Sequence, residues 1–113
     1  MNMEYIKNIP HNTVFGLSAE VGCLPGQIVS KTVAQNSAVS LTVFAFDKGE
    51  EISTHESAGD ALLTVLEGTG EVTVGTGKHT LNAGESIVMP ANVPHAVYAL
   101  ERFKMFLTVV FPV

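Results

Sequence analysis

Two histidines stand where the sequence could bind a metal ion or orient a polar ligand. His55 opens the stretch HESAGDALLTVLEG, and His95 closes the stretch GESIVMPANVPH. A neutral imidazole is a good ligand for Zn²⁺, Ni²⁺, Cu²⁺ and Fe²⁺. Both stretches have the apolar character of strands, so we expect the two imidazoles to lie on facing strands. The pair predicts a site that binds a metal ion or a small molecule.

A third ligand decides how strong such a metal site is, because tight transition-metal sites usually take three or four protein ligands. Asp60 is the candidate that we add to the two histidines. It follows Gly59, and a glycine at the start of a strand permits a bulge that would turn the carboxylate inward. In a regular strand Asp60 points outward and Ala61 points inward. The sequence leaves both orientations open.

The elements that must position these residues are predicted to be strands. The apolar segments are short, rich in Val, Thr, Leu and Phe, and bounded by Gly, Pro, Asn or Asp, which favours an all-β sandwich or barrel. Residues 1–25 show no alternation and are predicted to form an arm, a helical turn or an edge strand of the same domain, with residues 26–113 forming the barrel. The predicted strands are 27–34, 40–47, 61–68, 70–75, 79–81, 86–90, 95–100 and 104–111.

Composition limits the partners that the chain is expected to have. Its 113 residues fit one domain, and 6 Lys and Arg against 11 Asp and Glu give a net charge of -5, so we expect no nucleic acid partner. No apolar run is long enough to span a bilayer and no signal peptide is evident, which predicts a cytoplasmic protein without membrane contact. The single cysteine, Cys23, is expected to be a structural or incidental thiol.

The last predicted strand indicates how the chain assembles. MFLTVVF is apolar at both alternating sets of positions except at Thr108, whereas a strand with one solvent-facing side would alternate. Its outer face is therefore covered, either by another layer of the same chain or by a second copy. We favour the second copy and predict a homodimer.

The two histidine stretches resemble the two motifs of the cupin superfamily, which consists of small jelly-roll β-barrels. GEEISTHESAGDALLTVLEG resembles the first motif and GESIVMPANVPHAV the second, and together they cover about residues 49–99. Gly84, Pro90 and His95 take the places that the second motif expects. Asn92 stands where glycine is usual, but asparagine also tolerates left-handed backbone geometry. The resemblance implies an all-β, single-domain cupin-type jelly-roll barrel.

The resemblance also implies a metal, although the ligand set is incomplete. Three histidines and one glutamate hold one metal ion in the mouth of the barrel in this family. Carried over residue by residue, His55 takes the first histidine position and His95 the third. Ser57 stands at the second histidine position and Ala61 at the glutamate position. A divalent Zn, Ni, Fe, Mn or Cu ion is therefore expected to be held weakly, if at all.

Three functions are consistent with this pattern, and we favour a small-molecule-binding module. Its pocket would hold the ligand by apolar side chains with a few convergent polar groups. A metal-dependent enzyme of dioxygenase or isomerase type is the alternative, with Asp60 completing a two-histidine, one-carboxylate site. A structural or partner-binding dimer with a vestigial pocket is the third. The ligand-binding residues that we predict are Ser57, Leu63 and Met89, and further pocket-lining positions are Val65, Ile87 and Val97.

Overall fold

The computed structural model describes residues 4–113, which form nine strands and one short 3-10 helix. The all-β fold predicted from the sequence is confirmed. Each of the predicted strands is present, with its ends shifted by one or two residues. The elements are η1 (Leu17–Glu20), β1 (Ile28–Gln35), β2 (Val39–Phe46), β3 (Glu51–His55), β4 (Asp60–Glu67), β5 (Thr69–Val74), β6 (Gly77–Asn82), β7 (Ser86–Met89), β8 (His95–Ala99) and β9 (Phe103–Val110).

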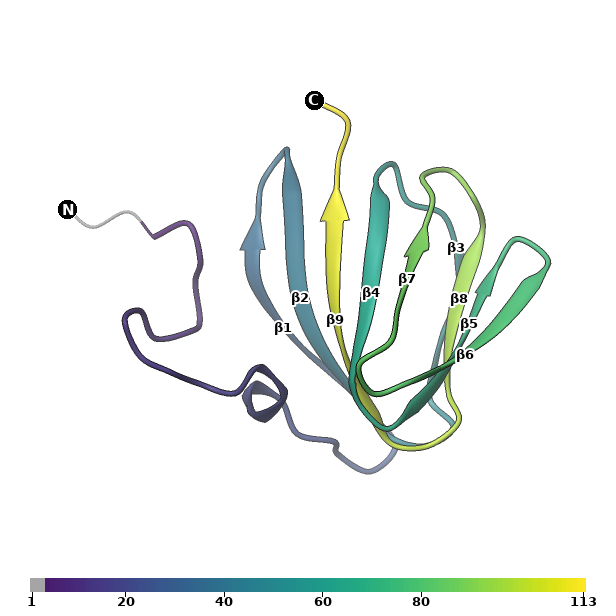
Figure 1. Cartoon of the computed structure of the whole chain (residues 1–113), viewed down its shortest axis with the longest axis horizontal. Coiled ribbons are helices and arrows are strands. Elements are labelled where there is room, and N and C mark those ends of the chain that lie inside the picture. Colours follow the sequence, from purple (N-terminus) through teal and green to yellow (C-terminus); the bar gives the residue numbers. More distant parts are fainter. Residues whose placement is uncertain (1–3) are drawn as a thin grey trace.

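The strands form two antiparallel sheets that face each other (Figure 1). One sheet has the order β1-β2-β9-β4-β7, and the other has the order β3-β8-β5-β6. The chain crosses repeatedly between the two sheets, as in a jelly roll. The β3–β4 and β7–β8 connections lie at the same end of the molecule, which is the upper end in Figure 1.

One element differs from the sequence prediction, and one alternative that the sequence left open is decided. The structure adds β3, which the strand pattern missed because EISTH is short and mostly polar, with an exposed surface along most of its length. This strand lies at the edge of its sheet and pairs only with β8. In the N-terminal segment, which allowed three alternatives, the helical turn η1 forms at Leu17–Glu20.

The core lies between the inner faces of the two sheets. Phe46 and Phe103, on neighbouring strands β2 and β9, are fully buried, and their rings stack with centroids 4.5 Å apart. Gly70 makes room for them, because a Cβ atom there would lie 2.9 Å from the Phe103 ring. The other buried members of this cluster are Ala61, Leu63, Val65, Val72, Leu81, Met89, Val97, Ala99 and Met105.

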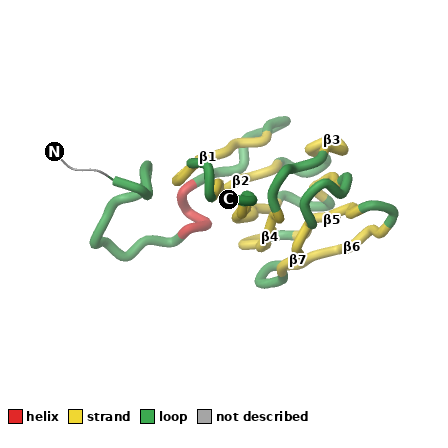
Figure 2. Tube along the Cα trace, turned by 90° about the horizontal axis from the view of Figure 1, so that it is seen from above, coloured by secondary structure: helices red, strands yellow, loops and turns green. Residues whose placement is uncertain are grey.

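A second cluster covers part of the outer face of the five-stranded sheet. Val43 and Ala45 on β2 are fully buried there beneath Val21, which follows η1, and Phe106 packs against the same group. Figure 2 shows η1 and the N-terminal segment on this side of the sheet, away from the four-stranded sheet. The chain thus covers one part of the outer face itself, which is the first of the two alternatives for the last strand.

Truncation of the central aromatic pair tests this account of the core. Phe103→Ala is expected to lower the free energy of unfolding by about 3–5 kcal/mol, because it removes a fully buried ring that cannot be replaced by neighbours. The exposed Tyr5→Ala is the control and should change that value by less than about 0.5 kcal/mol. Urea unfolding followed by circular dichroism measures both. Equal effects of the two changes would contradict a core centred on Phe103.

Candidate functional site

A β-bulge brings His55 to the same face as His95. Between β3 and β8, Ile52 pairs with Val97 and His55 pairs with His95, so three residue steps on β3 match two on β8. Residues three apart on a regular strand face opposite sides. The extra residue cancels this alternation, and both Ile52 and His55 lie over inward-facing residues of β8. Bulges re-aim side chains in this way next to functional sites.

The two imidazole rings meet directly. Their Nε2 atoms are 3.1 Å apart, and the rings are nearly perpendicular with centroids separated by 4.3 Å. His95 is buried, with 3% of its surface exposed, whereas His55 is exposed. The pair therefore connects the interior of the fold to solvent. The structure brings together the two histidines that the sequence predicted to form a site.

Backbone contacts fix the tautomer of both rings. The Nδ1 atom of His55 lies 2.9 Å from the carbonyl oxygen of Ser53, and that of His95 lies 3.1 Å from the carbonyl oxygen of Val93. A carbonyl oxygen only accepts hydrogen bonds, so each Nδ1 carries the proton and donates it. In two neutral rings both Nε2 atoms then present lone pairs to each other. Such a pair is stabilised by a proton shared between the two nitrogens, or by a metal ion or hydrogen-bond donor that contacts both of them.

Burial makes a proton the less favourable of these partners. The pKa of His95 is lowered from its ordinary value of 6.5, chiefly because burial disfavours the charged form. The hydrogen bond to Val93 opposes this effect, the proximity of His55 adds to the lowering, and the negative charge of Glu56 raises the pKa. The net direction favours a neutral His95 near neutral pH. Its Nε2 lone pair is then available to a ligand.

Two loops hold the site in place. The backbone N–H of Asn92, in the β7–β8 loop, donates to the carbonyl oxygen of Ser57 in the β3–β4 loop at 2.8 Å. Asn92 has a φ of 63°, which is left-handed backbone geometry. This geometry explains why the motif usually has glycine at this position and why asparagine can replace it. The N–H of Gly75 donates to the carbonyl oxygen of Pro94 at 2.8 Å and anchors the start of β8.

Asp60 does not lie with the two histidines. Its carboxylate accepts a hydrogen bond from the N–H of Ala91 at 2.8 Å, and β4 is regular at this point, with Asp60 opposite Val110. Gly59 allows the chain to pass close to the end of β9, because a Cβ atom at this position would collide with the Val110 carbonyl group. Among residues 4–113, no group of three or more His, Cys, Asp and Glu side chains is placed to hold a metal ion.

The predicted ligand-binding residues occupy different surroundings. Leu63 and Met89 are fully buried members of the core, so a bound molecule would reach them only if neighbouring side chains moved. Ser57 is half-buried, and its hydroxyl accepts a hydrogen bond from the N–H of Gly59 at 3.2 Å. Sequence reasoning missed the apolar residues next to the histidines. Val74 on β5 pairs with His95, and Ile52 is the inward-facing residue before His55 on β3. Both apolar side chains are partly buried against the core.

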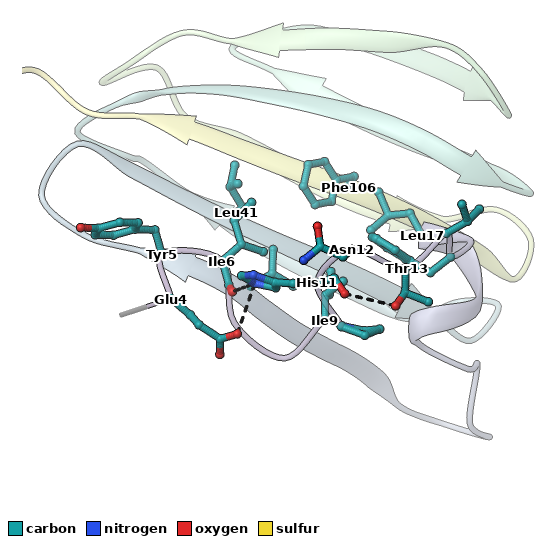
Figure 3. Close-up of a pocket in the computed structure, with 14 residues that line it drawn as sticks. Glu4, Tyr5, Ile6, Ile9, His11, Asn12, Thr13, Leu17, Leu41 and Phe106 are labelled. Atoms are coloured by element: carbon teal, nitrogen blue, oxygen red, sulfur yellow. Dashed lines mark hydrogen bonds and ion pairs between the residues drawn. The ribbon is translucent and has the colours of Figure 1, made fainter. Parts of the chain in front are cut away.

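A cavity of about 870 Å³ lies elsewhere, between the N-terminal segment and the outer face of β1, β2 and β9 (Figure 3). Neither His55 nor His95 lines it. Its walls are largely apolar, with Leu41 and Phe106 on the sheet and Ile6, Ile9 and Phe15 among those on the opposite side. This cavity and the histidine pair are therefore separate features of the molecule.

Comparison with known proteins identifies the family to which the fold belongs. The family model described as Cupin domain matches residues 42–111 of the chain, which is more than half of it. The chain belongs to the cupin family. The two facing antiparallel sheets are thus a cupin jelly roll. A comparison with curated proteins found no match.

Solved structures agree over most of the chain. A conserved protein of unknown function from Streptococcus pyogenes is 45% identical, with a TM-score of 0.96 over 98% of this chain and 97% of the other. A cupin superfamily protein from Desulfitobacterium hafniense is 29% identical, with a TM-score of 0.91 over 95% and 98%. A cupin 2 conserved barrel domain protein from Leptotrichia buccalis is 42% identical, with a TM-score of 0.83 over 85% of this chain and 47% of the other. Within residues 4–113, no helix is long and apolar enough to cross a membrane.

The lowered pKa of His95 predicts how stability depends on pH. Below about pH 6.5 the unfolded chain binds more protons at this position than the folded chain does, so the free energy of unfolding should fall as the pH is lowered through 6.5. His95→Gln should flatten this dependence. The exposed His79→Gln should leave it unchanged. Urea unfolding in the presence of a chelator measures the difference. The pH is varied from about 7.5 to about 5, a range that spans the ordinary pKa of histidine. An identical slope in wild type and His95→Gln would contradict the assignment.

Proposed function

We propose that this cupin binds a small molecule at the His55–His95 pair, through a weakly held divalent metal ion that the two imidazoles share. One observation carries the proposal: both rings are held in the same tautomer, so that two Nε2 lone pairs converge at 3.1 Å. Neutral rings in this arrangement repel each other, and a cation between them removes the repulsion. Backbone carbonyls orient metal-binding histidines in the same way in many metal sites.

The spacing of the nitrogens fits such an ion. Two Nε2 atoms 3.1 Å apart can both lie about 2.0–2.1 Å from one ion, which is the usual Zn–N distance. His55 and His95 would hold the ion, and no third His, Cys, Asp or Glu side chain of residues 4–113 joins them. Two ligands give weak binding, and the ion would leave at least half of its coordination positions to other molecules.

These open positions indicate the class of small molecule. When bound, the metal would supply a Lewis acid that accepts oxygen ligands, so an organic molecule with a carboxylate or neighbouring hydroxyl groups is the ligand that the site favours. Ile52 and Val74 flank the histidines and provide apolar contacts. We propose binding as the function because a reaction would need a further acid, base or ligand at the pair.

Metal titration tests the site directly. Untagged wild-type protein, stripped with a chelator, should bind about one Zn²⁺ or Ni²⁺ per chain by calorimetry. His55→Ala and His95→Ala should each weaken binding by at least about a hundredfold, because even the loss of outer-shell partners costs about 10–100-fold. His79→Ala is the matched control, since it removes an exposed histidine away from the pair.

Two results would contradict the metal-mediated proposal. Binding that is equal in wild type and both variants would place the ion elsewhere. Absence of metal binding, with a carboxylate or polyol ligand that still binds in a His55- and His95-dependent manner, would show that the imidazoles accept hydrogen bonds from the ligand directly. Thermal unfolding with and without each ligand distinguishes these cases, because a ligand that binds the folded state raises the Tm.

Restoring a family ligand gives an independent test. Ser57 stands at the second histidine position of the motif, so Ser57→His should add a third imidazole and tighten Zn²⁺ binding by at least about tenfold, equivalent to about 1.4 kcal/mol. The matched control is Ser53→His, which places an exposed histidine on β3 outside the motif position. An unchanged affinity in Ser57→His would show that this residue cannot reach an ion held by His55 and His95.

A further inference from the structure

His79 lies on the same face of the four-stranded sheet as the histidine pair. It belongs to β6, the strand at the free edge of this sheet, and its side chain is exposed. His79 pairs with Val72 on β5, and Val72 pairs with Val97 on β8; both valines are buried in the core. Residues that pair directly in antiparallel strands point to the same side of the sheet. His79 therefore faces inward, as His95 does, at an edge that solvent reaches.

The His79 ring leans toward the histidine pair, and Gly77 leaves room for it. A Cβ atom on Gly77 would lie 3.3 Å from Nε2 and 3.9 Å from Cε1 of His79. Gly77 is the preceding inward position on β6, and it pairs with Val74, which in turn pairs with His95. The imidazole of His79 thus extends from its own row of the sheet toward the row that contains His95.

One inward row of the sheet connects the three imidazoles. In the strand order β3-β8-β5-β6, this row consists of His55, His95, Val74 and Gly77. The tip of the β5–β6 hairpin lies at the same end of the molecule as the β7–β8 loop (Figure 1). Neighbouring strands are about 4.8 Å apart, so the backbones of His95 and Gly77 are about 10 Å apart. Half-buried Val74 and the bare backbone of Gly77 separate the histidine pair from the His79 ring.

The inner surface between these histidines carries no acidic side chain. Apart from His79 and His95, the inward positions of β5, β6, β7 and β8 are Gly70, Val72, Val74, Gly77, Leu81, Ile87, Met89, Val97 and Ala99. The carboxylate of this part of the sheet, Glu71, pairs with Tyr98 and Thr80 on the outer face. An anionic group beside His79 would therefore meet no like charge on the inner face. An imidazole can donate a hydrogen bond to a carboxylate or a hydroxyl group there.

We infer that His79 anchors the far end of the bound molecule, and that this molecule is an elongated organic acid with a polar group at each end and an apolar stretch between them. The inference rests on the proposed function, because one end would bind the ion held by His55 and His95. The apolar stretch would lie on Val74 and Gly77, and the far carboxylate or hydroxyl would accept a hydrogen bond from His79. Because His79 is exposed, the far end keeps part of its hydration, which limits the cost of desolvation.

Two acids of equal chain length test the inference. Pimelate carries a carboxylate at both ends, and heptanoate carries one. Calorimetry on zinc-saturated wild type should show that pimelate binds at least about tenfold more tightly than heptanoate, because only pimelate reaches His79 with a charged group. His79→Ala should remove this preference and leave the affinity for heptanoate unchanged. Lys78→Ala is the matched control, because Lys78 is the exposed neighbour of His79 on the same strand and points to the opposite face.

A second variant tests the path between the two ends. Gly77→Val places a side chain where a Cβ atom already lies 3.3 Å from Nε2 of His79, so it should displace the ring and reduce the affinity for pimelate to that for heptanoate. Valine suits an edge strand, and circular dichroism checks that the variant is folded. Zinc binding should match wild type in this variant. An unchanged preference for pimelate would show that the acid does not cross Gly77, and it would overturn the inference.

The remaining outcomes separate this inference from the proposed function. Equal binding of the two acids by wild type would overturn the inference, as would a preference for pimelate that survives in His79→Ala or is lost in Lys78→Ala. If zinc binds at the pair but neither acid binds, the inference falls and the metal site stands. If a chelator leaves a His79-dependent preference for pimelate, the metal-mediated function falls and the anchor at His79 stands. Absence of both zinc and acid binding would overturn both.

Discussion

The packing of the two sheets against each other is the constraint on which the other features of this cupin depend. Strand β9 lies between β2 and β4, and its inward residues Phe103 and Met105 are buried with Phe46 at the centre of the fold. Each fully buried apolar side chain of this size contributes about 1.5–3 kcal/mol relative to exposure. This burial fixes the register of the central strands. The edge strand β3 docks on β8 with a bulge, and the central strand β4 has a further register shift against β9, between Val65 and Glu67.

Polar groups inside a protein are normally paired as donor and acceptor. The two Nε2 atoms of the histidine pair are an exception. Two backbone carbonyls impose the same tautomer on both rings, and the resulting lone pairs face each other. An arrangement of this kind costs stability unless a ligand relieves it, and functional sites are where folded proteins retain such costs. The family ligand set is reduced here to two imidazoles. Under the proposed function, a bound molecule would have to contribute more to this site than it does to a complete cupin metal centre.

The two faces of the five-stranded sheet serve different purposes. Its inner face closes the core, and its outer face is covered in one part by η1 and Val21 and left apolar in another, around Leu62 and Val88. The histidine pair lies on the opposing sheet, between β3 and β8. The covered part of the outer face and the histidine pair therefore lie on different sheets.

The sequence by itself determined the strands, the family and the two histidines. Alternation and turn residues are local properties, and residues 27–111 carried them clearly enough to predict eight of the nine strands. Only the tertiary structure decided the strand β3, the orientation of Asp60 and the tautomers of the rings. EISTH has no apolar alternation, and its bulge exists only because β8 is its partner. Asp60 points outward because β4 pairs regularly with β9 from this residue onward, and its carboxylate accepts a hydrogen bond from Ala91. The proton positions follow from carbonyl groups whose placement depends on the tertiary structure.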